Sequence, residues 1–135
     1  MAAMSGALQC FFFWLPAVPV EIVISSGNVE VNPGQAVLLT CISQGLPLPT
    51  ITWYGPNGGG NLSNETHPRV NVFESTETKR GVTFLRSILQ LCNIDGMDSG
   101  DYRCFAENGL TNDTATIQLC ALGKTDSCSH FRYCL

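Results

Sequence analysis

The stretch that decides the fold runs from residue 89 to residue 108 and reads Leu89-Gln90-Leu91-Cys92-Asn93-Ile94-Asp95-Gly96-Met97-Asp98-Ser99-Gly100-Asp101-Tyr102-Arg103-Cys104-Phe105-Ala106-Glu107-Asn108. Apolar residues stand at every second position on both sides of its centre, which is the period of a β-strand with one buried face. The centre, Asp98-Ser99-Gly100, has turn composition, and Gly100 permits a tight bend. The stretch therefore predicts β-structure interrupted by a turn.

The same pattern extends in both directions, from about Val20 to Leu119, and predicts an all-β protein. Val37, Leu39 and Cys41 alternate with Leu38, Thr40 and Ile42, so a cysteine lies on an inner face. The prolines within Gly45–Pro49 make the chain cross to a new strand, and the polar residues Glu74–Gly81 are expected to form a turn. The expected strands cover residues 21–25, 29–31, 36–43, 50–54, 69–73, 82–91 and 114–119.

Taken with Cys41 and Trp53, the opening stretch resembles the I-set or C2-type immunoglobulin domains of adhesion molecules and receptor ectodomains. The resemblance implies a Greek-key β-sandwich of two antiparallel sheets. It also implies a disulfide between Cys41 and Cys104 with Trp53 packed against it, and a tyrosine corner at Tyr102. One position departs from the family pattern, because Thr111 stands where a glycine is usual and Gly109 comes earlier.

Three segments are expected: a signal peptide or N-terminal extension over residues 1–19, an immunoglobulin-like domain over residues 20–119, and a cysteine-containing tail over residues 120–135. The apolar stretch Phe11–Leu15 resembles the core of a signal peptide, although no Lys or Arg precedes it. An unprocessed extension is the alternative. The stretch is too short for a membrane span, and no other segment is expected to provide one.

Cysteines and glycosylation sequons favour an oxidising compartment. The chain has 7 cysteines in 135 residues, and they are not arranged as CxxC pairs. Sequons at Asn61, Asn64 and Asn112 predict N-linked glycans in a chain that is secreted or lies on the outer side of the cell surface. An intracellular location is the alternative if the sequons are unused and the thiols are reduced.

The pairing of the remaining cysteines stays open. Removal of residues 1–19 would leave Cys92, Cys120, Cys128 and Cys134 besides the predicted pair, and four cysteines allow three connectivities. Cys92 is expected to face outward at the same end of the domain as Cys120, so a bridge between them, bridges to the tail and free thiols are all open. Zinc ligation by Cys120, Cys128, His130 and Cys134 would lack a familiar spacing, so no metal is expected.

Composition and motifs argue against several functions. Charged residues make up 13% of the chain and its net charge is -4, so nucleic-acid binding is not expected. His67 and His130 have no nucleophile motif around them, and Gly58–Gly60 lacks the Lys and helix of a phosphate loop. Asp98 and Asp101 lie at a turn, where Asp98 is expected to cap the chain or pair with Arg69. We therefore expect no enzyme activity and no cofactor.

A protein-binding module in cell adhesion or receptor recognition is the function that the resemblance implies, with another extracellular or cell-surface protein as the partner. A structural spacer in a longer extracellular array is the alternative. A recognition module predicts an exposed apolar or aromatic patch without glycans, and Tyr54 and Phe105 are outward candidates. A homophilic or disulfide-linked dimer is a further open alternative.

Overall fold

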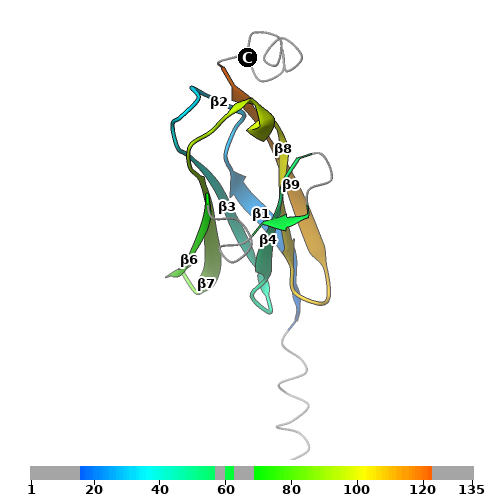
Figure 1. The fold of residues 1–135 in the computed structure, drawn as a ribbon. Helices are drawn as coiled ribbons and strands as arrows, with labels where there is room; N and C mark the ends of the chain where they lie inside the picture. The colour runs from blue at the N-terminus through cyan, green and yellow to red at the C-terminus, as the bar shows by residue number, and fades with distance from the viewer. Residues whose placement is uncertain (1–15, 57–59, 63–68, 123–135) are drawn as a thin grey trace, which may run out of the picture.

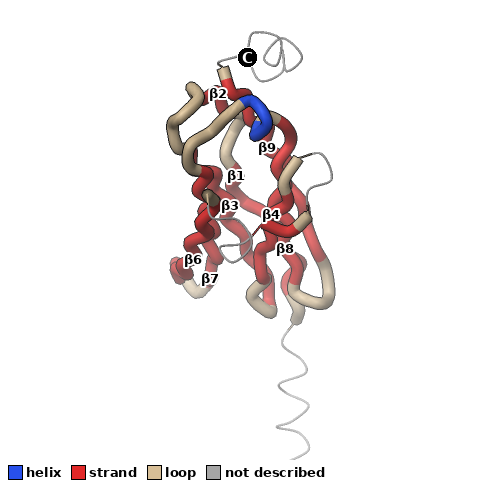
Figure 2. Tube along the Cα trace, viewed as in Figure 1, coloured by secondary structure: helices blue, strands red, loops and turns tan. Residues whose placement is uncertain are grey.

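The computed structural model describes residues 16–56, 60–62 and 69–122, and it confirms the predicted all-β sandwich (Figures 1 and 2). A single short 3-10 helix, η1, interrupts the strands within these residues. The elements in chain order are β1 (Val18–Ser25), β2 (Val29–Val31), β3 (Val37–Leu46), β4 (Thr50–Tyr54), β5 (Asn61–Leu62), β6 (Val70–Lys79), β7 (Val82–Leu91), η1 (Gly96–Asp98), β8 (Gly100–Glu107) and β9 (Asn112–Ala121).

Two sheets form the layers of the sandwich. The four-stranded sheet has the order β1-β3-β7-β6, and the five-stranded sheet has the order β2-β9-β8-β4-β5. All neighbouring strands are antiparallel except β2 and β9, which are parallel. The start of β1 and the end of β9 lie at opposite ends of the sandwich (Figure 1).

The core lies between the sheets and is built from the inward residues of the predicted alternations. Leu39 and Cys41 of β3 are fully buried, as is Leu89 of β7, and Trp53 of β4 is 1% exposed. Neighbouring strands bring these positions together, because Leu39 pairs with Leu89 and Trp53 pairs with Cys104. Alternation within each strand therefore becomes one continuous apolar layer.

The expected turn over Glu74–Gly81 is wrong, because β6 continues through Glu74 to Lys79 and pairs with β7 along its whole length. Only Arg80 and Gly81 form the connection, and both have positive φ angles, of 53° and 80°. Two such residues make a tight hairpin turn whose twist matches the flanking strands. The polar residues of β6 are tolerated in a strand because they lie at the exposed edge of the sheet.

The connection between β8 and β9 shows how the chain accommodates Thr111. Gly109 supplies the positive φ angle, of 87°, and the Asn108 side-chain oxygen accepts hydrogen bonds from the backbone N–H groups of Leu110 and Thr111 at 3.0 Å each. The Thr111 hydroxyl accepts a hydrogen bond of 2.8 Å from the backbone N–H of Val20. Thr111 therefore ties β1 to this hairpin.

Candidate functional site

The disulfide and its tryptophan form the centre of the molecule. Cys41 of β3 is joined to Cys104 of β8, with their Cα atoms 6.6 Å apart, so the bond links the two sheets. Trp53 belongs to the same buried cluster, and its indole N–H donates a hydrogen bond of 2.9 Å to the hydroxyl oxygen of Ser87. The sequence interpretation missed Ser87, although its position between the inward residues Leu85 and Leu89 is a signal that its hydroxyl needs a partner.

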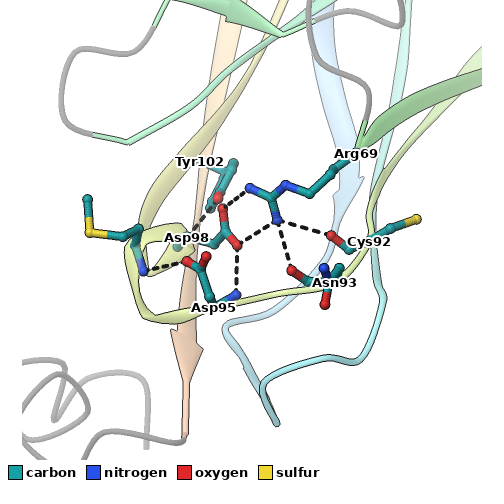
Figure 3. A network of polar contacts seen from close by, with 7 residues as sticks. Arg69, Cys92, Asn93, Asp95, Asp98 and Tyr102 are labelled. Atoms are coloured by element: carbon teal, nitrogen blue, oxygen red, sulfur yellow. Dashed lines mark hydrogen bonds and ion pairs between the residues drawn. The ribbon is translucent and has the colours of Figure 1, made fainter.

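A network of polar contacts closes the end of the sandwich where β8 begins (Figure 3). The Tyr102 hydroxyl donates a hydrogen bond of 2.7 Å to the backbone carbonyl of Asp98. Asp98 and Asp95 form a capping box around η1, in which the Asp98 carboxylate accepts from the Asp95 backbone N–H at 2.8 Å. The backbone and side chain of Asp98 thus anchor both the tyrosine and the turn.

Arg69 completes this network from the segment before β6. Its guanidinium donates to both carboxylate oxygens of Asp98, at 3.0 and 3.1 Å, and to the carbonyls of Cys92 and Asn93. This arrangement joins the start of β6, the end of β7 and the turn before β8. The two turn aspartates differ in role, because Asp98 holds this network whereas Asp101 is exposed.

The electrostatics of the network follow from its geometry. Burial opposes ionisation of Asp98, but the hydrogen bonds from Arg69 and the Asp95 backbone outweigh it and lower the pKa of Asp98. The hydrogen bond to Asp98 raises the pKa of Arg69. Burial and the nearby Asp98 charge raise the pKa of Tyr102, so it remains a hydrogen-bond donor. The charges of Asp98 and Arg69 and the neutral hydroxyl of Tyr102 therefore stabilise the fold.

The outer face of the five-stranded sheet carries the predicted aromatic residues. Tyr54 and Phe105 are half-buried and line a shallow depression of about 230 Å³ with Arg103 and Thr114. The Arg103 guanidinium carbon lies 5.5 Å from the centre of the Tyr54 ring, which is the geometry of a cation–π contact. An aromatic and arginine cluster is thus preorganised on this face.

Two of the sequons flank this cluster. Asn61 of β5 is exposed and stands directly opposite Tyr54, while Asn112 of β9 is exposed and stands opposite Glu107. Directly opposite residues share a face, so both asparagines lie on the same face as Tyr54 and Phe105. Asn64, the third sequon, lies outside the described residues.

The outer face of the four-stranded sheet carries exposed apolar side chains among its polar ones, where an outer face is usually polar. Ile24, Leu38 and Phe73 are 56%, 54% and 53% exposed. We call six of the outward apolar residues of this sheet the outer apolar face. By strand register they are Ile24, Leu38, Ile42, Phe73, Phe84 and Ile88. A groove of about 430 Å³ runs over Ile24, Ile42 and Phe84 toward β6.

The cysteines other than Cys41 and Cys104 differ in their bonding. Cys92 is a half-buried free thiol, whereas Cys120 is fully buried and disulfide-bonded. The open alternative of a bridge between Cys92 and Cys120 is therefore wrong. Among the described residues, no group of three or more His, Cys, Asp or Glu side chains is placed to hold a metal ion. Cys128, His130, Cys134 and His67 lie outside them.

The fold and the disulfide-centred core define the class of protein. Residues 19–108 match the immunoglobulin domain family, and the chain belongs to that family. The described residues contain no helix long and apolar enough to cross a membrane.

Several curated proteins are similar to the chain. It is 37% identical over 101 residues to the mouse peroxidasin homolog, 34% identical over 86 residues to the human neural cell adhesion molecule L1, and 32% identical over 99 residues to the Drosophila cell adhesion molecule Dscam2. These alignments cover 75%, 64% and 73% of this chain, but only 6%, 6% and 4% of the relatives. The chain thus corresponds to a small part of each.

Solved structures share the fold. The N-terminal Ig1-2 module of the Drosophila receptor protein tyrosine phosphatase DLAR matches with a TM-score of 0.62 and 31% identity, over 76% of this chain and 48% of that one. Titin domain M7 matches with a TM-score of 0.61 and 18% identity, over 78% of this chain and 96% of that one. The second match concerns the fold alone.

Proposed function

We propose that the chain is an extracellular protein-binding module that acts in cell adhesion or receptor recognition, with another extracellular or cell-surface protein as its partner. The observation that carries the proposal is the outer apolar face. Exposed Ile24, Leu38 and Phe73 stand on one face of a rigid strand framework, and apolar side chains exposed on one face are typical of interaction sites.

The core disulfide and the similar proteins support the same proposal. A disulfide inside the core suits an oxidising compartment, and two of the relatives carry the name of cell adhesion molecules. The carboxylate oxygens of the turn residue Asp98 accept hydrogen bonds from Arg69 and the Asp95 backbone. Binding rather than catalysis is the function we propose.

Glycosylation would direct partners to the outer apolar face. We assign N-linked glycans to Asn61 and Asn112, whose side chains are exposed on the opposite face, beside Tyr54 and Glu107. Glycans there would crowd the Tyr54, Arg103 and Phe105 cluster. The sequons at Asn61 and Asn112 leave the outer apolar face free.

A structural spacer is the second candidate, and a separate observation favours it. Val18, Leu46, Leu48 and Val82 are exposed and line a hollow of about 400 Å³ at the end of the sandwich where β1 begins. A neighbouring domain in an array would cover such an end. The chain also enters and leaves the described sandwich at opposite ends, as tandem stacking requires (Figure 1).

The test is a binding screen of the glycosylated, secreted chain against an arrayed library of extracellular proteins. The double variant Ile24→Lys, Leu38→Lys places charge in the outer apolar face, and we expect it to weaken binding to a captured partner by about tenfold or more. Thr116→Lys, an exposed position on the opposite face, is the matched control and should bind as the unmodified chain does.

Two results would count against the proposal. Unchanged binding by the Ile24 and Leu38 variant would remove the outer apolar face as the site, and loss of binding by Phe105→Ala instead would move the site to the opposite face. A screen without any partner, together with a large gain in stability when a neighbouring domain is attached before Val18, would favour the spacer.

A further inference from the structure

The two sequon asparagines within the described residues have different neighbours. Asn61 of β5 stands directly opposite the aromatic residue Tyr54 of β4, whereas Asn112 of β9 stands directly opposite Glu107 of β8. The Cβ atoms of directly opposite residues are about 4.5–5.5 Å apart, and their side chains leave the sheet on the same face. A group attached to Asn61 therefore begins beside the Tyr54 ring.

The row of residues that begins at Asn61 continues across this face of the sheet. Tyr54 is paired with Arg103 of β8, and Arg103 is paired with Thr116 of β9. β5 is the edge strand of the five-stranded sheet, so the row runs from the edge toward the middle. A chain of sugars that starts at Asn61 and crosses the strands would pass first over Tyr54 and then over Arg103.

Tyr54 and Arg103 together have the chemistry that a sugar needs from a protein surface. The half-buried Tyr54 ring offers apolar surface, and the Arg103 guanidinium, whose carbon lies 5.5 Å from the ring centre, carries N–H donors and no acceptor. Within the described residues, this guanidinium has no ion pair and no hydrogen bond. A pyranose ring matches both groups, because its C–H groups form an apolar face and its hydroxyl and acetamide oxygens accept hydrogen bonds.

The shape of this surface favours a ligand that is attached to the protein. The depression that Tyr54 and Arg103 line with Phe105 and Thr114 has a volume of about 230 Å³. Pockets that enclose a drug-sized ligand are larger, at about 300–1,000 Å³. A free sugar would therefore bind weakly here. A sugar linked to Asn61 is held at an effective concentration in the millimolar range, so a weak contact becomes populated.

We propose that the N-linked glycan of Asn61 packs its first sugars on Tyr54 and Arg103 and thereby stabilises the domain. The inference rests on the Asn61 glycan assigned above, and it gives that glycan a structural role beyond the direction of partners. Burial of the exposed part of the ring under the apolar face of a sugar supplies the stabilisation.

A double-mutant cycle on the secreted, glycosylated chain tests the contact. Asn61→Gln removes the glycan, and we expect the melting temperature to fall by about 4–8 °C if the contact is equivalent to one aromatic pair. In a Tyr54→Thr background the same change should lower the melting temperature by less than half as much, because the ring is already absent. Tyr54→Phe keeps the ring and should restore the full effect of Asn61→Gln.

Asn112→Gln is the matched control, since it removes the glycan from the other described sequon on the same face. Its effect on the melting temperature should be the same with and without the Tyr54→Thr change. Mass spectrometry of the secreted chain measures occupancy at both asparagines. An unoccupied Asn61, an unchanged melting temperature in Asn61→Gln, or an equal fall with and without the Tyr54 ring would each overturn the inference.

NMR of the intact glycoprotein observes the contact without a change in stability. Protons of the first sugar on Asn61 should be shifted upfield by the ring current of Tyr54, and random-coil shifts for these protons would contradict the packing. Ile24→Lys, Leu38→Lys alters the outer apolar face and should leave both the NMR shifts and the effect of Asn61→Gln unchanged. Failure of this inference and failure of the proposed binding site are therefore distinguishable.

Discussion

At the scale of single residues, the hydrogen bond between Trp53 and Ser87 is the polar contact at the centre of the core. Trp53 is 1% exposed and Ser87 is fully buried, so neither group can exchange its partner for water. A buried indole N–H without an acceptor costs free energy, which explains why a serine stands among the leucines of β7. Ser43, also fully buried, has no polar partner among the described residues.

These two serines give a matched pair of substitutions. Ser87→Ala leaves the Trp53 N–H unpaired, and we expect it to lower the free energy of unfolding by about 1–3 kcal/mol. Ser43→Ala removes a hydroxyl that has no bond to lose, so its effect should be close to zero. Urea denaturation of both variants measures the difference. Equal destabilisation would mean that the hydrogen bond to Trp53 contributes nothing beyond the volume of the serine.

At the scale of elements, the Arg69–Asp98 pair fastens three segments that are distant in sequence. Arg69 lies before β6, Asp98 ends η1, and the carbonyls that Arg69 also binds follow β7. The Asp98 side chain is 14% exposed and accepts two hydrogen bonds from one guanidinium. Bidentate, partly buried contacts of this kind stabilise more than isolated surface ion pairs do.

The lowered pKa of Asp98 sets the pH dependence of this contact. Its stabilisation is fully present above the ordinary pKa of 3.8 and is lost as the pH falls through the lower pKa of the folded state. We expect Asp98→Asn to reduce the free energy of unfolding by about 1–2 kcal/mol at neutral pH. The gap to the unmodified chain should narrow below pH 3.8. Thermal unfolding across this range measures the gap, and a gap that stays constant in acid would contradict the role of the carboxylate charge.

At the scale of the whole molecule, the Cys41–Cys104 disulfide holds the two sheets together. The bond closes a sequence separation of 63 residues. In the loop-entropy description, a loop of that length contributes about 4 kcal/mol to stability. This is close to the whole net stability of many small domains. The remaining cysteines are not equivalent, because Cys92 is a free thiol.

We therefore expect Cys41→Ala or Cys104→Ala to give a poorly folded and poorly secreted chain. Cys92→Ser is the control and should change neither secretion nor the melting temperature by much, since it breaks no bond. Secreted yield and thermal unfolding measure both effects. Normal secretion and an unchanged melting curve for either core variant would show that the bridge is not a major structural element.

The sequence by itself determined the fold class and its centre. Alternation with period two placed Leu39, Cys41 and Trp53 on inner faces, and these local patterns survive because each strand buries a single face. The resemblance to immunoglobulin domains predicted the disulfide and the tyrosine corner. The contact between Asp98 and Arg69 was also predictable, because an aspartate in a turn needs a partner for its charge.

Only the tertiary structure decided the features that depend on distant partners. β6 reads as a polar turn in sequence, and it becomes a strand because β7 supplies a full ladder of hydrogen bonds along Val70–Lys79. Ser87 gains its role from Trp53, which lies 34 residues away. The outer apolar face likewise follows from which strands lie side by side. Burial and backbone pairing are long-range properties, so local composition alone does not specify them.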